Sequence, residues 1–156
     1  MLFRSTQSLR KSGVDVPSVL REALAHLVLK FDISEDKTLV SLETFYKKAT
    51  VHNAFNESNF WSQNAVIQLI NDKITVLKSG TRLDCALEKT NREMFTKKNG
   101  AGFGGFNVLV LLSDGRTRLS ANCDNITSSI KDLKVTIIQL ASFSKQIQIS
   151  GGVFSS

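Results

Sequence analysis

One carboxylate stands where a buried strand would end. The aliphatic residues 108–112 predict a strand buried on both faces, and Ser113, Asp114 and Gly115 follow directly. In an open α/β sheet, ligands collect beyond the carboxyl ends of such strands. An aspartate on a tight turn there offers hard oxygen donors to a cation or a cationic partner. The alternative is a plain turn, because Asp-Gly is a common turn signal.

Hydroxyl side chains in two other segments could meet that carboxylate. Thr6 and Ser8 follow what would be the end of a first strand, and Thr81 precedes a predicted helix. In a doubly wound sheet, the loops that carry these residues meet at one edge, so the hydroxyls and Asp114 would converge there. Hydroxyls with a carboxylate suit Mg²⁺, which retains waters and can take an acidic residue of a partner as its last ligand.

The elements that must position these residues alternate between helices and strands. The spacing of apolar residues predicts helices over residues 17–31, 62–77, 83–95 and 126–133. Strands are predicted over residues 38–46, 50–55, 108–112 and 135–140, with one or two more between 146 and 156. The first two of these strands would form a hairpin at a sheet edge. Along residues 38–46, Ser41 and Glu43 alternate with Val40 and Leu42, so the strand would have one polar face and one more apolar face.

This order of elements defines the expected fold class. It is α/β: a three-layer Rossmann-like sandwich with a mainly parallel central sheet, one antiparallel edge strand and helices on both faces. The chain has 156 residues, of which 42% are hydrophobic and one is proline, so we expect a single globular domain over residues 1–156 and no disordered or fibrous chain. No apolar stretch approaches membrane-spanning length, so no membrane insertion is expected.

The net charge of +6 favours acidic partners. The basic residues, however, are scattered in doublets such as Lys47-Lys48 and Lys97-Lys98, a pattern typical of a solvated surface. Cys85 and Cys123 cannot form a metal cluster by themselves, and they are either one disulfide or two buried thiols.

Two segments carry the signal for N-linked glycosylation, at Asn56 and Asn125. These sequons favour a secreted protein. The alternative is chance, because such triplets are common in chains rich in Asn and Ser.

Enzymatic chemistry finds little support. The glycine-rich loop 100–105 follows a predicted helix and enters a strand, whereas a phosphate-binding loop follows a strand and opens a helix. Neither His26 nor His52 accompanies a recognisable nucleophile motif, and no paired carboxylates stand out. We therefore expect no enzyme and no small-molecule substrate.

Four segments, taken in their order and spacing, resemble a von Willebrand factor type A domain. Residues 31–37 resemble the family's turn into its second strand, and residues 42–51 resemble the hairpin. Residues 79–87 resemble the segment Gly-Gly-Thr-x-x-x-x-Ala-Leu, whose threonine is a metal ligand, and residues 108–116 resemble the strand and loop VLVLLTDGRS. The resemblance covers nearly the whole chain.

The resemblance implies a metal-ion-dependent adhesion site. In the family, a DxSxS motif joins that threonine and the loop aspartate, and the matching ligand positions here are Thr6, Ser8, Thr81 and Asp114. The leading aspartate of the motif falls on Arg4. Two unit charges about 4 Å apart in a partly buried setting interact by roughly 4 kcal/mol. Arg4 therefore opposes a dication and could instead pair with Asp114, so the implied Mg²⁺ site is degenerate.

The same resemblance implies a function. It is that of a non-enzymatic adhesion domain in an extracellular or matrix protein, secreted and glycosylated, which binds a matrix or cell-surface protein at the edge above the parallel strands. The alternatives are a purely structural module of an extracellular assembly without metal, and an intracellular nucleic-acid-binding domain. Because the family's first strand is longer than residues 1–3, we expect a chain that is incomplete at its N-terminus and part of a longer protein.

Overall fold

The computed structural model of the protein describes residues 15–76, 82–102, 106–112 and 123, together with the backbone of residues 2–4, 113 and 136–141. The predicted helix 126–133 and the predicted strands beyond residue 146 lie outside this part of the chain. The described strands form one sheet in the order β3-β2-β1-β4-β5. Their bounds are Leu2–Arg4 for β1, Glu43–Phe45 for β2, Ala49–Val51 for β3, Val108–Ser113 for β4 and Thr136–Ala141 for β5.

The sheet is parallel except at one edge. Strand β1 pairs in parallel with β2 and β4, and β4 pairs in parallel with β5. Strand β3 is antiparallel to β2 and lies at the edge, so the predicted edge hairpin is confirmed. The three-residue β1 therefore lies in the middle of the sheet and is hydrogen-bonded on both sides.

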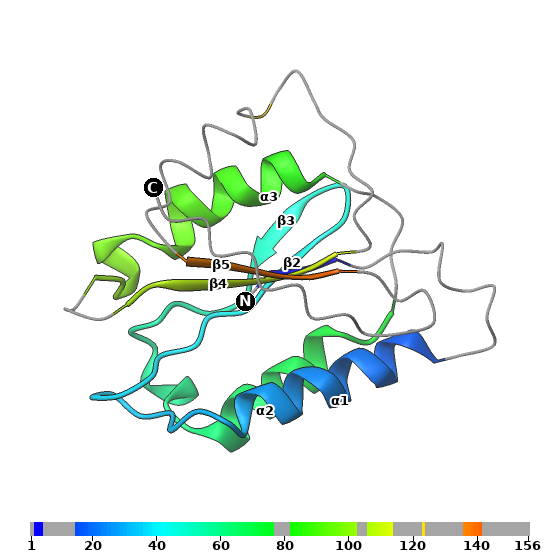
Figure 1. Cartoon of the computed structure of the whole chain (residues 1–156). Helices are drawn as coiled ribbons and strands as arrows, with labels where there is room; N and C mark the ends of the chain where they lie inside the picture. The colour runs from blue at the N-terminus through cyan, green and yellow to red at the C-terminus, as the bar shows by residue number, and fades with distance from the viewer. Residues whose placement is uncertain are drawn as a thin grey trace.

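Helices lie on both sides of the sheet. Helices α1 (Val16–Val28) and α2 (Gln63–Lys73) pack side by side below it in Figure 1, and α3 (Leu83–Lys89) lies above it. Helix α3 continues as a π-helical segment, Thr90–Met94. The predicted α/β class is thus confirmed. In the described part of the chain, no helix combines the length and the apolar character that a membrane crossing needs.

Strand β4 shows why its residues form an uninterrupted aliphatic run. Leu109 and Leu111 pack with Phe45 and with the buried residues of α3, whereas Leu112 belongs to the core on the α1 and α2 side. Successive side chains of a strand point to opposite faces, so a strand covered by helices on both sides needs apolar residues at every position. Val108 departs from this prediction, because it is 43% exposed at the start of the strand.

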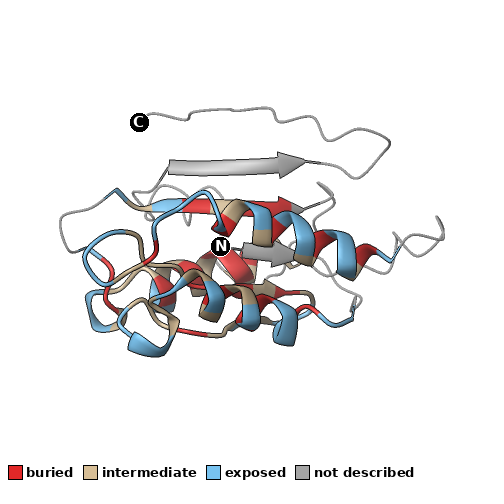
Figure 2. Ribbon diagram, turned by 90° about the horizontal axis from the view of Figure 1, so that it is seen from below, coloured by how far each residue is buried: buried red, intermediate tan, exposed pale blue. Residues whose placement is uncertain are grey.

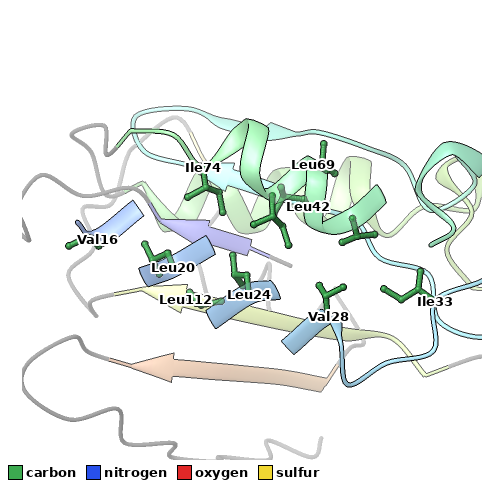
Figure 3. Close-up of a cluster of buried hydrophobic side chains, with 11 residues drawn as sticks. Val16, Leu20, Leu24, Val28, Ile33, Leu42, Leu69, Ile74 and Leu112 are labelled. Atoms are coloured by element: carbon green, nitrogen blue, oxygen red, sulfur yellow. The ribbon is translucent and has the colours of Figure 1, made fainter. Parts of the chain in front are cut away.

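The larger core lies between the sheet and the pair α1 and α2. Helix α1 buries one residue per turn, and these residues contact the apolar face of α2 (Figure 3). The α1 residues are Val16, Leu20, Leu24 and Val28. The opposite faces of the helices are exposed (Figure 2). The helix ends at Val28, before the predicted end at residue 31, and Leu29 and Phe31 are exposed.

The hairpin strands are shorter than predicted because a side chain takes over their hydrogen bonding. Asn53 is buried, its Oδ1 accepts from the backbone N–H of Leu42 at 2.8 Å, and its Nδ2 donates to the carbonyl of Val40 at 2.8 Å. The Ser41 hydroxyl donates to the carbonyl of Asn53 at 2.5 Å. Residues 40–42 and 53 are therefore joined through an amide side chain instead of by backbone pairing alone.

Glu43 corrects the prediction of a polar face along residues 38–46. Its side chain is 0% exposed, on the same face of β2 as Phe45 and beneath α3. Glu43 Oε2 accepts a hydrogen bond from the Thr90 hydroxyl at 2.9 Å, and Oε1 has no partner in the described part of the chain. Burial raises the pKa of this carboxyl to about 8, against the opposing effects of Thr90 and Lys89.

Candidate functional site

The strands that lead toward the predicted ligands end side by side. Leu2 pairs with Leu111 and Phe3 with Leu112, and the two parallel strands end at Arg4 and Ser113. On its other side, Arg4 pairs with Phe45, the last residue of β2. We call this edge of the sheet, formed by Arg4, Phe45 and Ser113, the carboxyl edge. The chain leaves it toward Thr6 and Ser8 after β1 and toward Asp114 after β4.

The start of α3 is attached to the same edge. The backbone N–H of Arg82 donates to the carbonyl of Tyr46 at 3.0 Å, and Tyr46 directly follows Phe45. Thr81 immediately precedes Arg82 in the sequence. Each of the three segments with predicted ligands thus adjoins a described residue at this edge. Arg4 and Ser113 lie at the carboxyl edge, and Arg82 is hydrogen-bonded to it.

The predicted ligands themselves are not among the described residues. Thr6, Ser8, Thr81 and Asp114 lie outside that part of the chain, as does the side chain of Arg4. Their mutual arrangement therefore remains a prediction that rests on the strands and the helix to which they are joined.

A disulfide crosses from α3 to the segment that follows Asp114. It joins Cys85 to Cys123, whose Cα atoms are 5.1 Å apart. Cys85 lies in the first turn of α3, four residues after Thr81, and Cys123 lies nine residues after Asp114. The bond therefore links the segment that follows Thr81 to the segment that follows Asp114.

A buried ion pair adjoins the disulfide, and sequence reasoning missed it. Asp84 is 1% exposed, and Arg82 Nε donates to its Oδ1 at 3.2 Å while Nη2 donates to its Oδ2 at 3.3 Å. Arg82 Nη2 also lies 2.9 Å from Cys85 Sγ and 3.7 Å from Cys123 Sγ. The sequence signal was an arginine and an aspartate two positions apart, next to Cys85. Such opposite charges usually belong to a solvated surface, so the pair was not predicted to be buried.

The other predicted positions lie apart from this arrangement. Asn56 is exposed, and its Nδ2 donates to the carbonyl of Lys98 at 3.0 Å, whereas Asn125 lies outside the described residues. His26 is exposed on α1. His52 Nε2 lies 2.7 Å from the Thr44 hydroxyl, across the hairpin.

The sequence profile of the von Willebrand factor type A domain family matches residues 5–148. The chain therefore belongs to this family, and the resemblance inferred from its motifs is confirmed. No curated protein matches the sequence.

Solved structures of similar fold include a mussel protein and a Plasmodium protein. Proximal thread matrix protein 1 from the mussel byssus has a TM-score of 0.76 at 18% identity in one crystal form. A structure of the same protein with a zinc-occupied MIDAS motif has a TM-score of 0.77 at 17% identity. The manganese-loaded TRAP protein of Plasmodium vivax has a TM-score of 0.67 at 12% identity.

These similarities extend over 90% of the chain, but the compared proteins are longer. The chain spans 36% of the mussel protein and 55% of the Plasmodium protein. At such low identity, the comparison establishes a shared Rossmann-like α/β fold and nothing about the ligands of this chain.

Proposed function

We propose that this domain is a non-enzymatic protein-binding module of an extracellular or matrix protein, and that its partner binds at the carboxyl edge. The sheet would be the middle layer of a three-layer sandwich, with the adhesion site on the loops that leave this edge. Its central groups would be the Asp114 carboxylate and the hydroxyls of Thr6, Ser8 and Thr81. The solved structures of similar fold include a matrix protein, which is consistent with this setting.

One observation carries the proposal. Arg4 and Ser113 end adjacent parallel strands, and Arg82 is hydrogen-bonded to the residue after β2 beside them. Ligands of open α/β sheets bind beyond the carboxyl ends of the strands. Two of the three loops begin at this edge and the third ends beside it, which supports a site there.

The donor set fits a hard cation only in part. Three hydroxyls and one carboxylate are oxygen donors of the kind Mg²⁺ accepts, with waters completing the shell. The segment that carries Thr6 and Ser8 also brings Arg4, at the end of β1, to the position where the family has an aspartate. A fixed positive charge at that point weakens a dication site, so the proposed site is degenerate and binds Mg²⁺ weakly.

Replacing Asp114 by alanine should abolish both Mg²⁺ binding and partner binding while the domain stays folded. The substitution removes the only carboxylate of the proposed donor set, and Asp114 directly follows the last residue of β4 in the sequence. Calorimetric titration with MgCl₂ and capture of partners from a matrix extract measure the two effects. Glu35→Ala, at an exposed acidic residue, is the control. Equal partner capture by wild type and Asp114→Ala would contradict the proposal.

A second candidate keeps the fold and omits the metal. In a purely structural module, Arg4 would pair with Asp114 and lock the edge, and the adjacent ends of β1 and β4 favour this pair. Replacing Arg4 by aspartate should then create Mg²⁺ binding that the wild type lacks, because a repelling charge becomes a ligand. Lys30→Asp makes the same charge change at an exposed position. If Arg4→Asp gains no affinity in the MgCl₂ titration, the candidate is wrong.

Secretion makes a separate prediction. The Asn56 side chain is exposed on a turn, so it is accessible for a glycan. When the chain is expressed through a eukaryotic secretory route, we expect treatment with peptide N-glycosidase to lower its mass. Asn56→Gln and Asn125→Gln should each reduce that loss of mass by the mass of one glycan. A mass that the enzyme leaves unchanged would speak against glycosylation.

A further inference from the structure

A second group of ligand-type atoms lies at the first turn of α3. Cys85 Sγ, Cys123 Sγ and a carboxylate oxygen of Asp84 all lie within 4.8 Å of one another. The two sulfur atoms are joined in the disulfide. We propose that the reduced, dithiol form of the protein uses these three residues as a binding site for a thiophilic divalent cation of the zinc class. This inference does not depend on the proposed function.

The spacing suits such a cation after a small rearrangement. Tetrahedral zinc has Zn–S distances of about 2.3 Å and Zn–O distances of about 2.0–2.2 Å, which separates its ligand atoms by roughly 3.5–3.8 Å. Once the disulfide opens, the sulfur atoms need to separate by only about 2 Å. Side-chain rotation can supply this movement, because the Cα atoms are already 5.1 Å apart. A water molecule would complete four-coordination.

Arg82 makes the group compatible with a bound dication. Its guanidinium holds both oxygens of the buried Asp84 carboxylate, which fixes the orientation of that carboxylate. A carboxylate has about four acceptor sites, and the two contacts with Arg82 use one on each oxygen. Two thiolates and one carboxylate carry three negative charges, and Arg82 with a dication balances them. The same guanidinium also donates to Cys85 Sγ at 2.9 Å.

The disulfide and the metal site exclude each other. In reduction by a small dithiol, a thiolate of the reductant attacks one sulfur and forms a mixed disulfide, and its second thiol then displaces the protein sulfur. The protein disulfide gains two electrons and two protons, and the reductant leaves as a cyclic disulfide. The cation then replaces the two thiol protons. Cys85 and Cys123 are half-buried, so a small thiol can reach the bond.

Cobalt provides the test because thiolate ligands give Co²⁺ a charge-transfer absorption. The full chain is reduced with dithiothreitol under nitrogen, freed of reductant and titrated with CoCl₂. We expect the thiolate band to saturate at one equivalent and to disappear when Zn²⁺ is added. Asp84→Asn should weaken cobalt binding by about tenfold or more, and Cys85→Ser should abolish the band. The oxidised protein should show no band.

Two further measurements separate this site from the carboxyl edge and from unfolding. Asp114→Ala should leave the cobalt band unchanged, and a band lost in that variant would overturn the assignment to Asp84, Cys85 and Cys123. Circular dichroism follows the fold during reduction. If the reduced wild type gives no band at one equivalent, or unfolds and does not regain its helical signal with Co²⁺ or Zn²⁺, the proposal is wrong. Unchanged affinity in Asp84→Asn would exclude the carboxylate as a ligand.

Discussion

Replacing Glu43 by glutamine is expected to remove most of the fall in stability that the wild-type protein shows between pH 5 and pH 8. The Glu43 carboxyl is fully buried, and burial raises its pKa from the ordinary 4.5 to about 8. Between these two values the folded protein keeps a proton that the unfolded chain has released. The free energy of unfolding therefore falls as the pH rises through this window and levels off above about pH 8.

The hydrogen bonds around Thr90 are compatible with a protonated Glu43, although the Thr90 hydroxyl by itself lowers the pKa of this carboxyl. The Thr90 hydroxyl lies 2.9 Å from Glu43 Oε2 and 2.9 Å from the carbonyl of Ala86, and it has one proton to donate. When that proton goes to the Ala86 carbonyl, the contact with Glu43 is a hydrogen bond only if the carboxyl donates. Of the charged groups that act on Glu43, the N-terminus and Lys89 lower its pKa and Glu93 raises it.

The expected slope is at most about 1.4 kcal/mol per pH unit, the value for one proton. Glutamine cannot ionise, so Glu43→Gln should lack this slope and be more stable than the wild type near pH 8, although its second amide N–H costs part of the gain. Urea unfolding at pH 5, 6, 7 and 8 measures both proteins. Glu35→Gln, at an exposed glutamate, should keep the wild-type slope. The same slope in Glu43→Gln as in the wild type would contradict the buried protonated acid.

Loss of the Cys85–Cys123 disulfide is expected to destabilise the oxidised protein by about 3–4 kcal/mol. The bond closes a loop with a sequence separation of 38 residues. In the chain-entropy description, a cross-link of this length lowers the entropy of the unfolded chain by an amount that corresponds to this energy at room temperature. Urea unfolding of the double variant Cys85→Ala, Cys123→Ala, with a chelator present, measures the loss.

The single variants provide the matched control. Cys85→Ala and Cys123→Ala each break the same bond, so each alone should cost nearly as much as the double variant. Costs that add would mean that the two side chains contribute separately and that the bond itself contributes little. Reduced wild type should resemble the variants in metal-free buffer.

Helices and strands could be predicted from the sequence where apolar residues recur at a regular interval. Leu20, Leu24 and Val28 recur at a helical interval, and the run 108–112 has apolar residues at every position, so each pattern has one simple structural solution. The ends of elements were harder. The hairpin strands were predicted too long because Asn53 was included in the second strand as a paired residue. Its side-chain amide instead bonds the backbone of Val40 and Leu42.

The chemistry of single residues was less predictable than the fold. Glu43 alternates with apolar residues as a solvent-facing strand residue would, but α3 and the π-helical segment after it, far along the chain, cover it. Arg82 and Asp84 were missed for the same reason, because their burial depends on the packing of α3 and on Cys123. The adjacent ends of β1, β2 and β4 followed from strand order, since parallel strands share one edge.

The central position of β1 has a consequence for how the protein acquires its structure during synthesis. The first residues of the chain need β4 as a neighbour, and β4 is translated about a hundred residues later. Until the ribosome has released that segment, β1 can pair only with β2, and the apolar surface that β4 covers stays exposed. Such long-range pairing slows folding and exposes intermediates to aggregation. Nascent chains that stop before residue 108 should therefore engage chaperones more strongly than chains that include β4.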